Sequence, residues 1–405
     1  MRPFDGRRIL LGVSGGIASY KSGWLARLLS QAGAQVDVVM TRSAMEFVGP
    51  ITFEALTGRP VHCEMFEVGQ ALDHIRLARE AEAIVIAPAT ADLMARAAQG
   101  QADDLLTACL LATGSTANGA PPVLFVPAMN DRMWAHLQTQ RNASRLRELG
   151  YRLLEPEIGM LAAGEGSGPG RMPEPETILA HVGRMLDRPD LRDRRVVVTA
   201  GPTREPLDPV RYLSNRSSGK MGTAVAAAAW RRGANVTLVA GPLEIAAPTG
   251  VTVVAVESTE QMRDAVARAL PDADVLVMAA APADFRAAAP APSKIKKSTA
   301  PTMTFSSTAD ILRETAPHRR RGAVIAGFAL ETDAAVASGR GKLASKDLDL
   351  VIVNDASEAG AGMSVDTNRV TILTRGGETE ELPLMLKTEL ADIILDRIGA
   401  LLREH

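Results

Sequence analysis

The chain has 405 residues, of which 46% are hydrophobic and 3% aromatic, and its formal net charge at pH 7 is −2. The near-neutral charge argues against a nucleic-acid-binding protein, and the scarcity of aromatic residues argues against a surface that stacks bases. No apolar run is long enough to cross a membrane, and charged residues stand near the N-terminus, where a signal peptide would be apolar. The two cysteines, Cys63 and Cys109, provide neither a disulfide framework nor a metal cluster, so we expect a cytoplasmic globular protein.

Both halves of the chain begin with the same pattern. Residues 8–13 predict a strand, the turn Ser14-Gly15-Gly16 follows, and a helix to about Gln31 leads into a second strand at 35–41. Residues 195–241 repeat this plan with a longer loop. Each half is therefore predicted to be an α/β domain with a parallel, Rossmann-like sheet. The phrase Gly-Ala-x-Val, which both halves share, also fits two helices that each end in glycine before a buried strand, and we infer no duplication.

A charged segment that contains a proline, residues 186–193, predicts a linker between the halves. The chain is long for a single core, and we expect one domain at 1–189 and a second at 190–405. A further irregular segment at 156–175 is rich in glycine and proline, and it is typical of a mobile lid over a site.

In the first half, polar residues follow three predicted strands. Ser14, Thr90 and Asn130 each stand just beyond a strand, and ligands of open α/β sheets bind at the carboxyl ends of strands. The second strand ends in Thr41-Arg42-Ser43, where a dinucleotide site would usually carry an acidic residue for the ribose. Hydroxyl groups and a cation suit a phosphate better, so the pattern favours a mononucleotide over NAD.

His74, at the start of a predicted helix, is a candidate general base because histidine titrates near neutral pH. For an isolated histidine, a partly exposed position at a helix start is the simpler interpretation.

In the second half, residues 199–222 form a long loop between a strand and an alanine-rich helix. Ser217 and Ser218 are candidate caps of that helix, and Gly219 and Gly222 would let the backbone approach a phosphate. An ordinary P-loop is excluded, because it needs glycine at position 214 and serine or threonine at position 221. The loop is predicted to cradle a phosphate, and the alternative is a well-capped connection. For Lys294, Lys296 and Lys297, the alternative to a binding role is a solvated basic turn.

Specific motifs carry a resemblance over nearly the whole chain. The first half contains GVSGGIASYK, an Asp73-His74 pair, APATAD, ADDLLT, PAMNDRMW and GPGRMPEP in this order, and it resembles flavin-dependent cysteine decarboxylases. The second half contains TAGPTREPLDPVRYLSNRSSGKMG, AAPADF, KIKK, GFALET and DLDLVIVND, and it resembles phosphopantothenate–cysteine ligases. Together they resemble the bifunctional bacterial phosphopantothenoylcysteine decarboxylase/phosphopantothenate–cysteine ligase family of coenzyme A biosynthesis.

For the first half, the resemblance implies a flavodoxin-like, FMN-dependent decarboxylase domain. His74 is implied to be the base that helps to oxidise the substrate thiol, and Asn130 to bind the substrate carboxylate. The residues implied to hold FMN are Ser14, Gly15, Gly16, Ile17, Ala18, Thr41, Pro88, Ala89 and Thr90.

The sequence departs from the family in the segment LAAGEGSGPGRM at 161–172. The family has a proton-donating cysteine there, and the corresponding residue is Ala163 in one register and Gly164 in the other, because this loop is one residue longer. The missing donor puts the final reduction of the enethiol in doubt. Ser167 is a poorer donor, and Cys109 is predicted to be a core residue.

For the second half, the resemblance implies a CTP-dependent ligase domain that uses Mg²⁺, with no predicted metal ligands. Asn215 is implied to contact the acyl-cytidylate, and Lys294 to stabilise charge as that intermediate forms. The residues implied to hold CTP are Met278, Ala279, Ala280, Asp284, Ala309, Asp310, Ile311, Leu312, Phe328, Lys342 and Lys346. Thr308-Ala309-Asp310 replaces the Asn-Pro-Asp of many relatives.

The implied small-molecule substrates are 4′-phosphopantothenate, L-cysteine, CTP and 4′-phosphopantothenoylcysteine, with no nucleic-acid or membrane partner. The resemblance also implies a homo-oligomer. Two alternatives remain: an active ligase whose flavoprotein half stops at the enethiol, and a flavin-binding regulatory protein.

Overall fold

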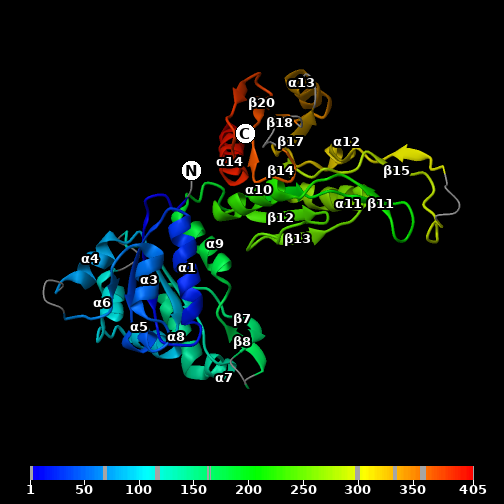
Figure 1. Ribbon diagram of the computed structural model, residues 1–405. Coiled ribbons are helices and arrows are strands. Elements are labelled where there is room, and N and C mark those ends of the chain that lie inside the picture. Colours follow the sequence, from blue (N-terminus) through cyan, green and yellow to red (C-terminus); the bar gives the residue numbers. More distant parts are fainter. Residues whose placement is uncertain are drawn as a thin grey trace. The chain divides into compact units, whose positions relative to one another are not determined.

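The computed structural model describes residues 3–66, 71–114, 119–161, 164, 166–296, 302–331, 335–355 and 362–404. The chain divides into two compact units, unit 1 (Met1–Asp187) and unit 2 (Arg188–His405), shown in Figure 1. No helix in these ranges is both long and apolar enough to cross a membrane.

Unit 1 is built on a parallel six-stranded sheet with the order β3-β2-β1-β4-β5-β6. Its strands are β1 (Arg8–Val13), β2 (Gln35–Met40), β3 (Val61–His62), β4 (Ala83–Ala89), β5 (Val123–Pro127) and β6 (Arg152–Leu153). Its helices are α1 (Ser19–Gln31), α2 (Arg42–Met45), α3 (Pro50–Thr57), α4 (Asp73–Glu80), α5 (Ala91–Gln99), α6 (Leu105–Ala112), α7 (Asp131–Ala135), α8 (Leu137–Glu148) and α9 (Pro175–Leu186). A separate antiparallel hairpin joins β7 (Glu157–Met160) to β8 (Ser167–Arg171).

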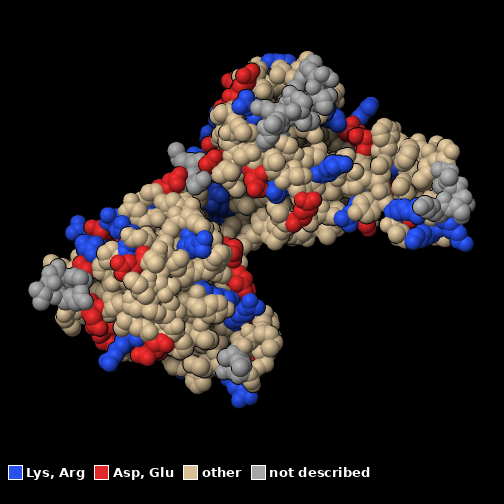
Figure 2. Space-filling model, viewed as in Figure 1, with Lys and Arg blue, Asp and Glu red and all other residues tan. Residues whose placement is uncertain are grey.

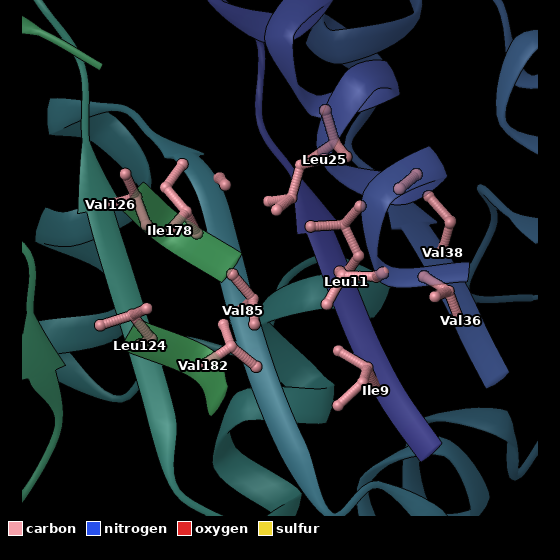
Figure 3. Packing of buried hydrophobic residues seen from close by; sticks show 14 of the residues in the cluster. Ile9, Leu11, Leu25, Val36, Val38, Val85, Leu124, Val126, Ile178 and Val182 are labelled. Atoms are coloured by element: carbon pink, nitrogen blue, oxygen red, sulfur yellow. The ribbon is translucent and has the colours of Figure 1, made fainter. Parts of the chain in front are cut away.

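Helices cover both faces of this sheet, which is why β4 is apolar along its whole length and β1 is apolar after Arg8. Successive side chains of a strand point to opposite faces. Ile9 and Leu11 therefore join the core beneath α1, α3 and α9, which Figure 3 shows, while Leu10 joins the core beneath α4, α5, α6 and α8. The strand order is that of a Rossmann fold, so the predicted Rossmann-like α/β domain is confirmed, with an order that differs from the 2-1-3-4-5 of flavodoxin.

Unit 2 repeats the order and adds to it. Its eight-stranded sheet runs β13-β12-β9-β14-β17-β18-β20-β21, with antiparallel pairing only at β20 and β21. These strands are β9 (Arg195–Ala200), β12 (Asn235–Ala240), β13 (Thr252–Ala255), β14 (Val275–Met278), β17 (Val324–Glu331), β18 (Leu350–Asp355), β20 (Thr371–Thr374) and β21 (Thr379–Glu381). The purely parallel sheet expected for this half is thus extended at one edge by two strands that the sequence did not predict.

One face of this sheet carries α10 (Lys220–Arg231) and α14 (Lys387–Glu404), which pack against each other. The other face carries α11 (Thr259–Ala269), α12 (Ile311–Glu314) and α13 (Ala335–Ser345), together with the short helices η2 (Leu270–Asp272) and η4 (Ala316–His318). An arm that extends from the sheet in Figure 1 contains the antiparallel pairs β10 (Arg204–Pro206)–β11 (Tyr212–Ser214) and β15 (Phe285–Ala287)–β16 (Phe305–Ser307). A last pair joins β19 (Thr367–Asn368) to β22 (Met385–Leu386).

Candidate active sites

In unit 1, the loop after β1 is tied to the loop after β4. The Ser14 hydroxyl donates to the carbonyl oxygen of Pro88 at 2.7 Å, and its oxygen accepts from the backbone N–H of Thr90 at 3.1 Å. Thr90 in turn caps α5, where its hydroxyl oxygen accepts from the N–H of Leu93. The structure therefore brings together two of the segments that were predicted to hold a flavin.

A third loop, after β2, lies against the same place. A Cβ on Gly15 would lie 2.5 Å from the Cβ and Oγ of Ser43, so only glycine fits this contact without movement. The Thr41 side chain lies 3.1 Å from Ser43 Oγ and caps α2. The backbone N–H groups of Gly15, Ile17 and Ala18 have no acceptor within the described ranges. Free N–H groups at a helix start, with hydroxyls beside them, are suited to bind a phosphate, so these residues fit a flavin mononucleotide.

An open cavity of about 430 Å³ adjoins this loop and is lined by Thr41, Arg42, Ser43, Glu46, Arg96 and Asp104. Arg96 forms ion pairs with Asp92, Asp103 and Asp104 at 3.1, 3.0 and 2.8 Å. Burial disfavours the charged guanidinium, but the hydrogen bonds to Asp104 and Asp103 outweigh burial and raise the pKa of Arg96. Arg96 thus stays charged at the wall of the cavity.

Asn130 lies beyond β5, where its side-chain oxygen accepts from the N–H of Arg132 at 2.9 Å. The β7–β8 hairpin packs on this loop, because the N–H of Met129 donates to the carbonyl oxygen of Gly170 at 3.0 Å. A Cβ on Gly170 would overlap the Met129 carbonyl, and one on Gly168 would lie 2.8 Å from Asp131. The segment predicted as a lid is therefore a glycine-dependent hairpin against the Asn130 loop. Gly164, with a φ of +86°, lies between its strands, whereas Ala163 is outside the described residues.

His74 is the second residue of α4 and is half-buried. The preceding Asp73 pairs with Nδ1 of His62 at 3.2 Å and with Arg76, which fixes the start of α4 to the end of β3. Since α4 leads into β4 of a parallel sheet, its first turn lies toward the carboxyl edge. No hydrogen bond or ion pair described here joins His74 to Ser14 or Thr90, so its role as base stays a prediction.

Cys109 is fully buried in the core, and burial raises the pKa of its thiol to about 12. The prediction that it is a core residue is confirmed.

In unit 2, a cleft of about 660 Å³ opens beyond the carboxyl ends of β14, β17 and β18. The lining residues that the sequence had predicted are Asn215, Met278, Ala279, Ala280, Asp284, Ala309, Asp310, Ile311, Leu312, Phe328, Lys342 and Lys346. Parallel strands place these distant segments side by side because their carboxyl ends share one edge of the sheet.

Hydrogen bonds hold the floor of this cleft. The Asn215 amide donates to the carbonyls of Ala281 and Pro282 at 3.1 and 2.9 Å. The N–H of Ala280 donates to the Thr199 hydroxyl at 3.0 Å, which links the ends of β14 and β9. The long loop after β9 is thus attached to the loop after β14, and Asn215 lies where the two meet.

The start of α10 differs from the predicted cap. The N-cap residue is Gly219, whose φ of +80° favours glycine, and no side chain caps the helix. Ser218 instead donates to the carbonyl of Met363 at 2.7 Å, and Ser217 accepts from the N–H of Gly219 at 3.4 Å. The predicted capping by these serines is wrong because the left-handed turn directs them away from the first helical N–H groups.

Two lysines at the cleft were not predicted. Lys387, only 5% exposed, donates to the carbonyls of Gly362, Met363 and Val365 at 3.1, 3.1 and 2.6 Å. Burial, and secondarily the charge of Lys220, lowers the pKa of Lys387. Lys220 donates to Ser364 O and to Asp366 at 2.9 and 2.7 Å. Both lysines therefore hold the segment 362–366 in place. The sequence around each lysine does not indicate this role, because the acceptors are distant in the chain.

Lys294 is exposed and is absent from the lining of this cleft. Its neighbour Ile295 donates its N–H to Asp208 at 3.1 Å and accepts from Arg211 at 2.8 Å, which fastens this segment to the β10–β11 turn. Basic side chains also gather near the free end of the arm on the face shown in Figure 2. The structure thus leaves Lys294 apart from the other predicted nucleotide residues.

Comparisons with known proteins cover both units. Family models described as "Flavoprotein" and "DNA/pantothenate metabolism flavoprotein C-terminal domain" match residues 2–186 and 191–402. The Coenzyme A biosynthesis bifunctional protein CoaBC of Mycobacterium tuberculosis is 46% identical over 97% of this chain and 96% of its own length. The proteins of the same name from Vibrio vulnificus and Bacillus subtilis are both 42% identical over 99% of this chain, and over 100% and 98% of their own lengths. Because the similarity spans both units at this identity, the chain belongs to the family of bifunctional coenzyme A biosynthesis proteins.

Proposed function

We propose that unit 2 ligates 4′-phosphopantothenate to cysteine with CTP, and that unit 1 decarboxylates the resulting 4′-phosphopantothenoylcysteine with FMN. The observation that carries this proposal is the unit 2 cleft, where residues from four separate segments of the predicted nucleotide site meet. Relatives named as bifunctional coenzyme A biosynthesis proteins over nearly the full length support both activities.

The charge of the unit 2 cleft suits a reaction between anions. Lys342 and Lys346 line the cleft near Asp310, and Lys220 and Lys387 lie along it as well. Activation of a carboxylate by a nucleoside triphosphate brings several negative charges together, and preorganised cations lower the barrier for such a step. Mg²⁺ would add to this charge compensation, and Asn215, whose amide donates to two backbone carbonyls, would contact the activated acyl group.

Unit 1 supplies binding and orientation. The free N–H groups of Gly15, Ile17 and Ala18 would hold the phosphate of FMN, and Ser14, Thr41 and Thr90 would border it. The bound flavin would accept a hydride equivalent from the substrate thiol and return one after carbon dioxide has left. Asn130 would bind the substrate carboxylate beneath the β7–β8 hairpin, and His74 would take the thiol proton.

A second candidate function for unit 1, release of the enethiol as product, is favoured by the missing cysteine in the segment between β7 and β8. Neither register of the family cysteine holds a proton donor here, since Ala163 and Gly164 occupy the two positions. A unit without this donor would oxidise and decarboxylate its substrate, release the enethiol and leave the two electrons on the flavin, so that without an external oxidant such as O₂ it would form one enethiol for each flavin bound. A purely regulatory flavin-binding protein is disfavoured by the unit 2 cleft, which is lined by all the predicted ligase residues except Lys294.

One experiment separates these functions. The purified chain is supplied with CTP, Mg²⁺, phosphopantothenate and cysteine under anaerobic conditions, and products are identified by mass spectrometry. Pyrophosphate and phosphopantetheine support the bifunctional enzyme, accumulation of the enethiol supports the second candidate, and the absence of CTP-dependent pyrophosphate release contradicts both.

We also propose that the protein acts in the cytoplasm as a homo-oligomer through unit 1. Large apolar side chains are exposed on α1 and α3 and in the loops just before these two helices, which contact each other: Ile17, Tyr20, Trp24, Phe47 and Ile51. Such a face is typical of an interface between subunits. Light scattering should show an assembly that Ile51→Asp dissociates, and a wild-type monomer at micromolar concentration would contradict the proposal.

A further inference from the structure

Behind the nucleotide end of the unit 2 cleft, one arginine joins two helix ends. Arg319 follows η4, and its side chain is 11% exposed. Its Nη2 donates to the carbonyl oxygens of Leu312 at 2.8 Å and Lys346 at 3.1 Å, and its Nη1 donates to that of Asp347 at 2.8 Å. The acceptors belong to α12 and to the residues that follow α13, and both elements contribute residues to the cleft.

The geometry of these acceptors explains why an arginine is needed. The last carbonyls of a helix lack an intrahelical partner, and α13 ends at Ser345, two residues before Asp347, whose φ of +50° turns the chain out of the helix. A guanidinium presents several donors in a fixed plane, so one side chain can serve carbonyls from two chain segments. A lysine at this position would have a single ammonium, a compact group that lacks the planar spread of donors needed to reach all three oxygens. Arg319 therefore sets the spacing between α12 and the end of α13.

A second link joins the same segments on the cleft side. The Lys346 ammonium lies 3.3 Å from Asp310 Oδ1, and Asp310 also caps α12 by accepting from the N–H of Arg313 at 3.3 Å. An incoming phosphate competes with Asp310 for the Lys346 charge. When the Lys346 ammonium binds a phosphate in place of Asp310, the hydrogen bonds of Arg319 still hold the Lys346 backbone against α12.

We propose that Arg319 is a positioning residue for the nucleotide substrate, which keeps Lys346 and α12 at a fixed spacing while Lys346 exchanges Asp310 for a phosphate. This inference rests on the proposed use of CTP by unit 2. Arg319 itself lies behind the cleft and does not line it. Its buried Nε has no acceptor within the described residues, which lowers the stability of the fold. A role in fixing the spacing of the two segments would explain why the arginine is present despite this cost.

The test compares Arg319→Gln and Arg319→Lys with the control Arg321→Ala, an exposed arginine two residues further along. Pyrophosphate release is measured while CTP and phosphopantothenate are varied separately. We expect the KM for CTP to rise about tenfold in Arg319→Gln and less in Arg319→Lys, which is what the loss of charge-assisted hydrogen bonds implies. The KM for phosphopantothenate, and all constants of Arg321→Ala, should stay within about twofold.

The outcomes distinguish a failure of the inference from a failure of the proposed function. A wild-type chain that consumes no CTP overturns both, whereas normal CTP use with an unchanged KM in Arg319→Gln overturns only the positioning role. A double variant with Lys346→Ala distinguishes positioning from general stability. If Arg319 acts through Lys346, the double variant should bind CTP no worse than Lys346→Ala alone, and additive losses would contradict the inference.

Discussion

Replacement of Gly222 by alanine should cripple ligation and spare decarboxylation. Gly222 lies in the first turn of α10, whose neighbouring residues Lys220 and Met221 line the unit 2 cleft. A Cβ there would lie 2.6 Å from the carbonyl oxygen of Thr199 and 2.6 Å from the Cβ of Ala200. Both atoms belong to β9, a central strand that is paired on both sides, so neither atom can move without disturbing the sheet.

The size of the effect follows from these distances. Normal contacts need about 3.5 Å, so α10 must move by roughly 1 Å away from β9. Overpacking of this kind costs about 1–3 kcal/mol, and for a unit of this size it lowers the Tm by roughly 2–12 °C. A displacement of ~1 Å in a binding element typically costs ~100-fold in rate, which we expect for ligation.

The assay measures both activities and the thermal transition on one sample, so that unit 1 serves as an internal reference. Gly341→Ala is the matched control, because Gly341 also lies within a helix but a Cβ there would meet nothing within 4 Å. That control should be neutral or more stable by up to about 1 kcal/mol, since alanine favours helix. Ligation by Gly222→Ala at the wild-type rate would show that the packing of α10 on β9 does not position the cleft.

Three further outcomes are expected. His74→Asn should abolish decarboxylation while the protein keeps its yellow colour and its ligation activity; loss of bound flavin from the folded variant would make His74 structural. The role that the family resemblance implies for Lys294 predicts that Lys294→Ala slows acyl-cytidylate formation by about two orders of magnitude, as one preorganised charge donor is worth ~3 kcal/mol, whereas its exposed position outside the lining of the cleft predicts a rate within a few-fold of wild type, which would assign Lys294 to a solvated turn. Gly164→Cys or Ala163→Cys should speed the final reduction by about two to four orders of magnitude and remove any enethiol, and a wild-type chain that makes phosphopantetheine without detectable enethiol would contradict that expectation.

The family resemblance named the candidate nucleotide residues of unit 2, and all of them except Lys294 line one cleft in the structure, because the topology of the sheet brings their segments together. Once residues 275–278 and 324–331 are parallel strands, their carboxyl ends must share one edge, so Ala280, which follows the first strand, and Phe328, in the carboxyl-terminal half of the second, come to the same cleft. The identities of the lining residues came from the motifs that carry the family resemblance, and not from the topology.

Other features depend on contacts between distant segments, which a sequence pattern does not encode. Lys387 begins a helix and has the pattern of a solvated residue, yet three carbonyls from 362–365 bury its ammonium. Ser218 has the sequence context of a cap but bonds to Met363. The antiparallel strands β20 and β21 are short, and nothing before them marks a change of direction. Each of these outcomes is decided by tertiary contacts rather than local preference.

Both units place their sites by the same physical device. In each unit, six parallel strands follow the order 3-2-1-4-5-6, so that successive strands are added on one side of strand 1 and then on the other. The loops after strands 1 and 4 therefore lead to opposite faces of the sheet and leave a crevice between them. A hydroxyl bridges that gap in both cases: Ser14 accepts from the N–H of Thr90 at 3.1 Å, and Thr199 accepts from the N–H of Ala280 at 3.0 Å. A hydroxyl is small enough to stay buried between the loops, and it leaves the other N–H groups of the Ser14 loop free for a ligand. Because each bridge lies within its own unit, the loss of one should disable a single activity, and this independence lets one chain carry two reactions.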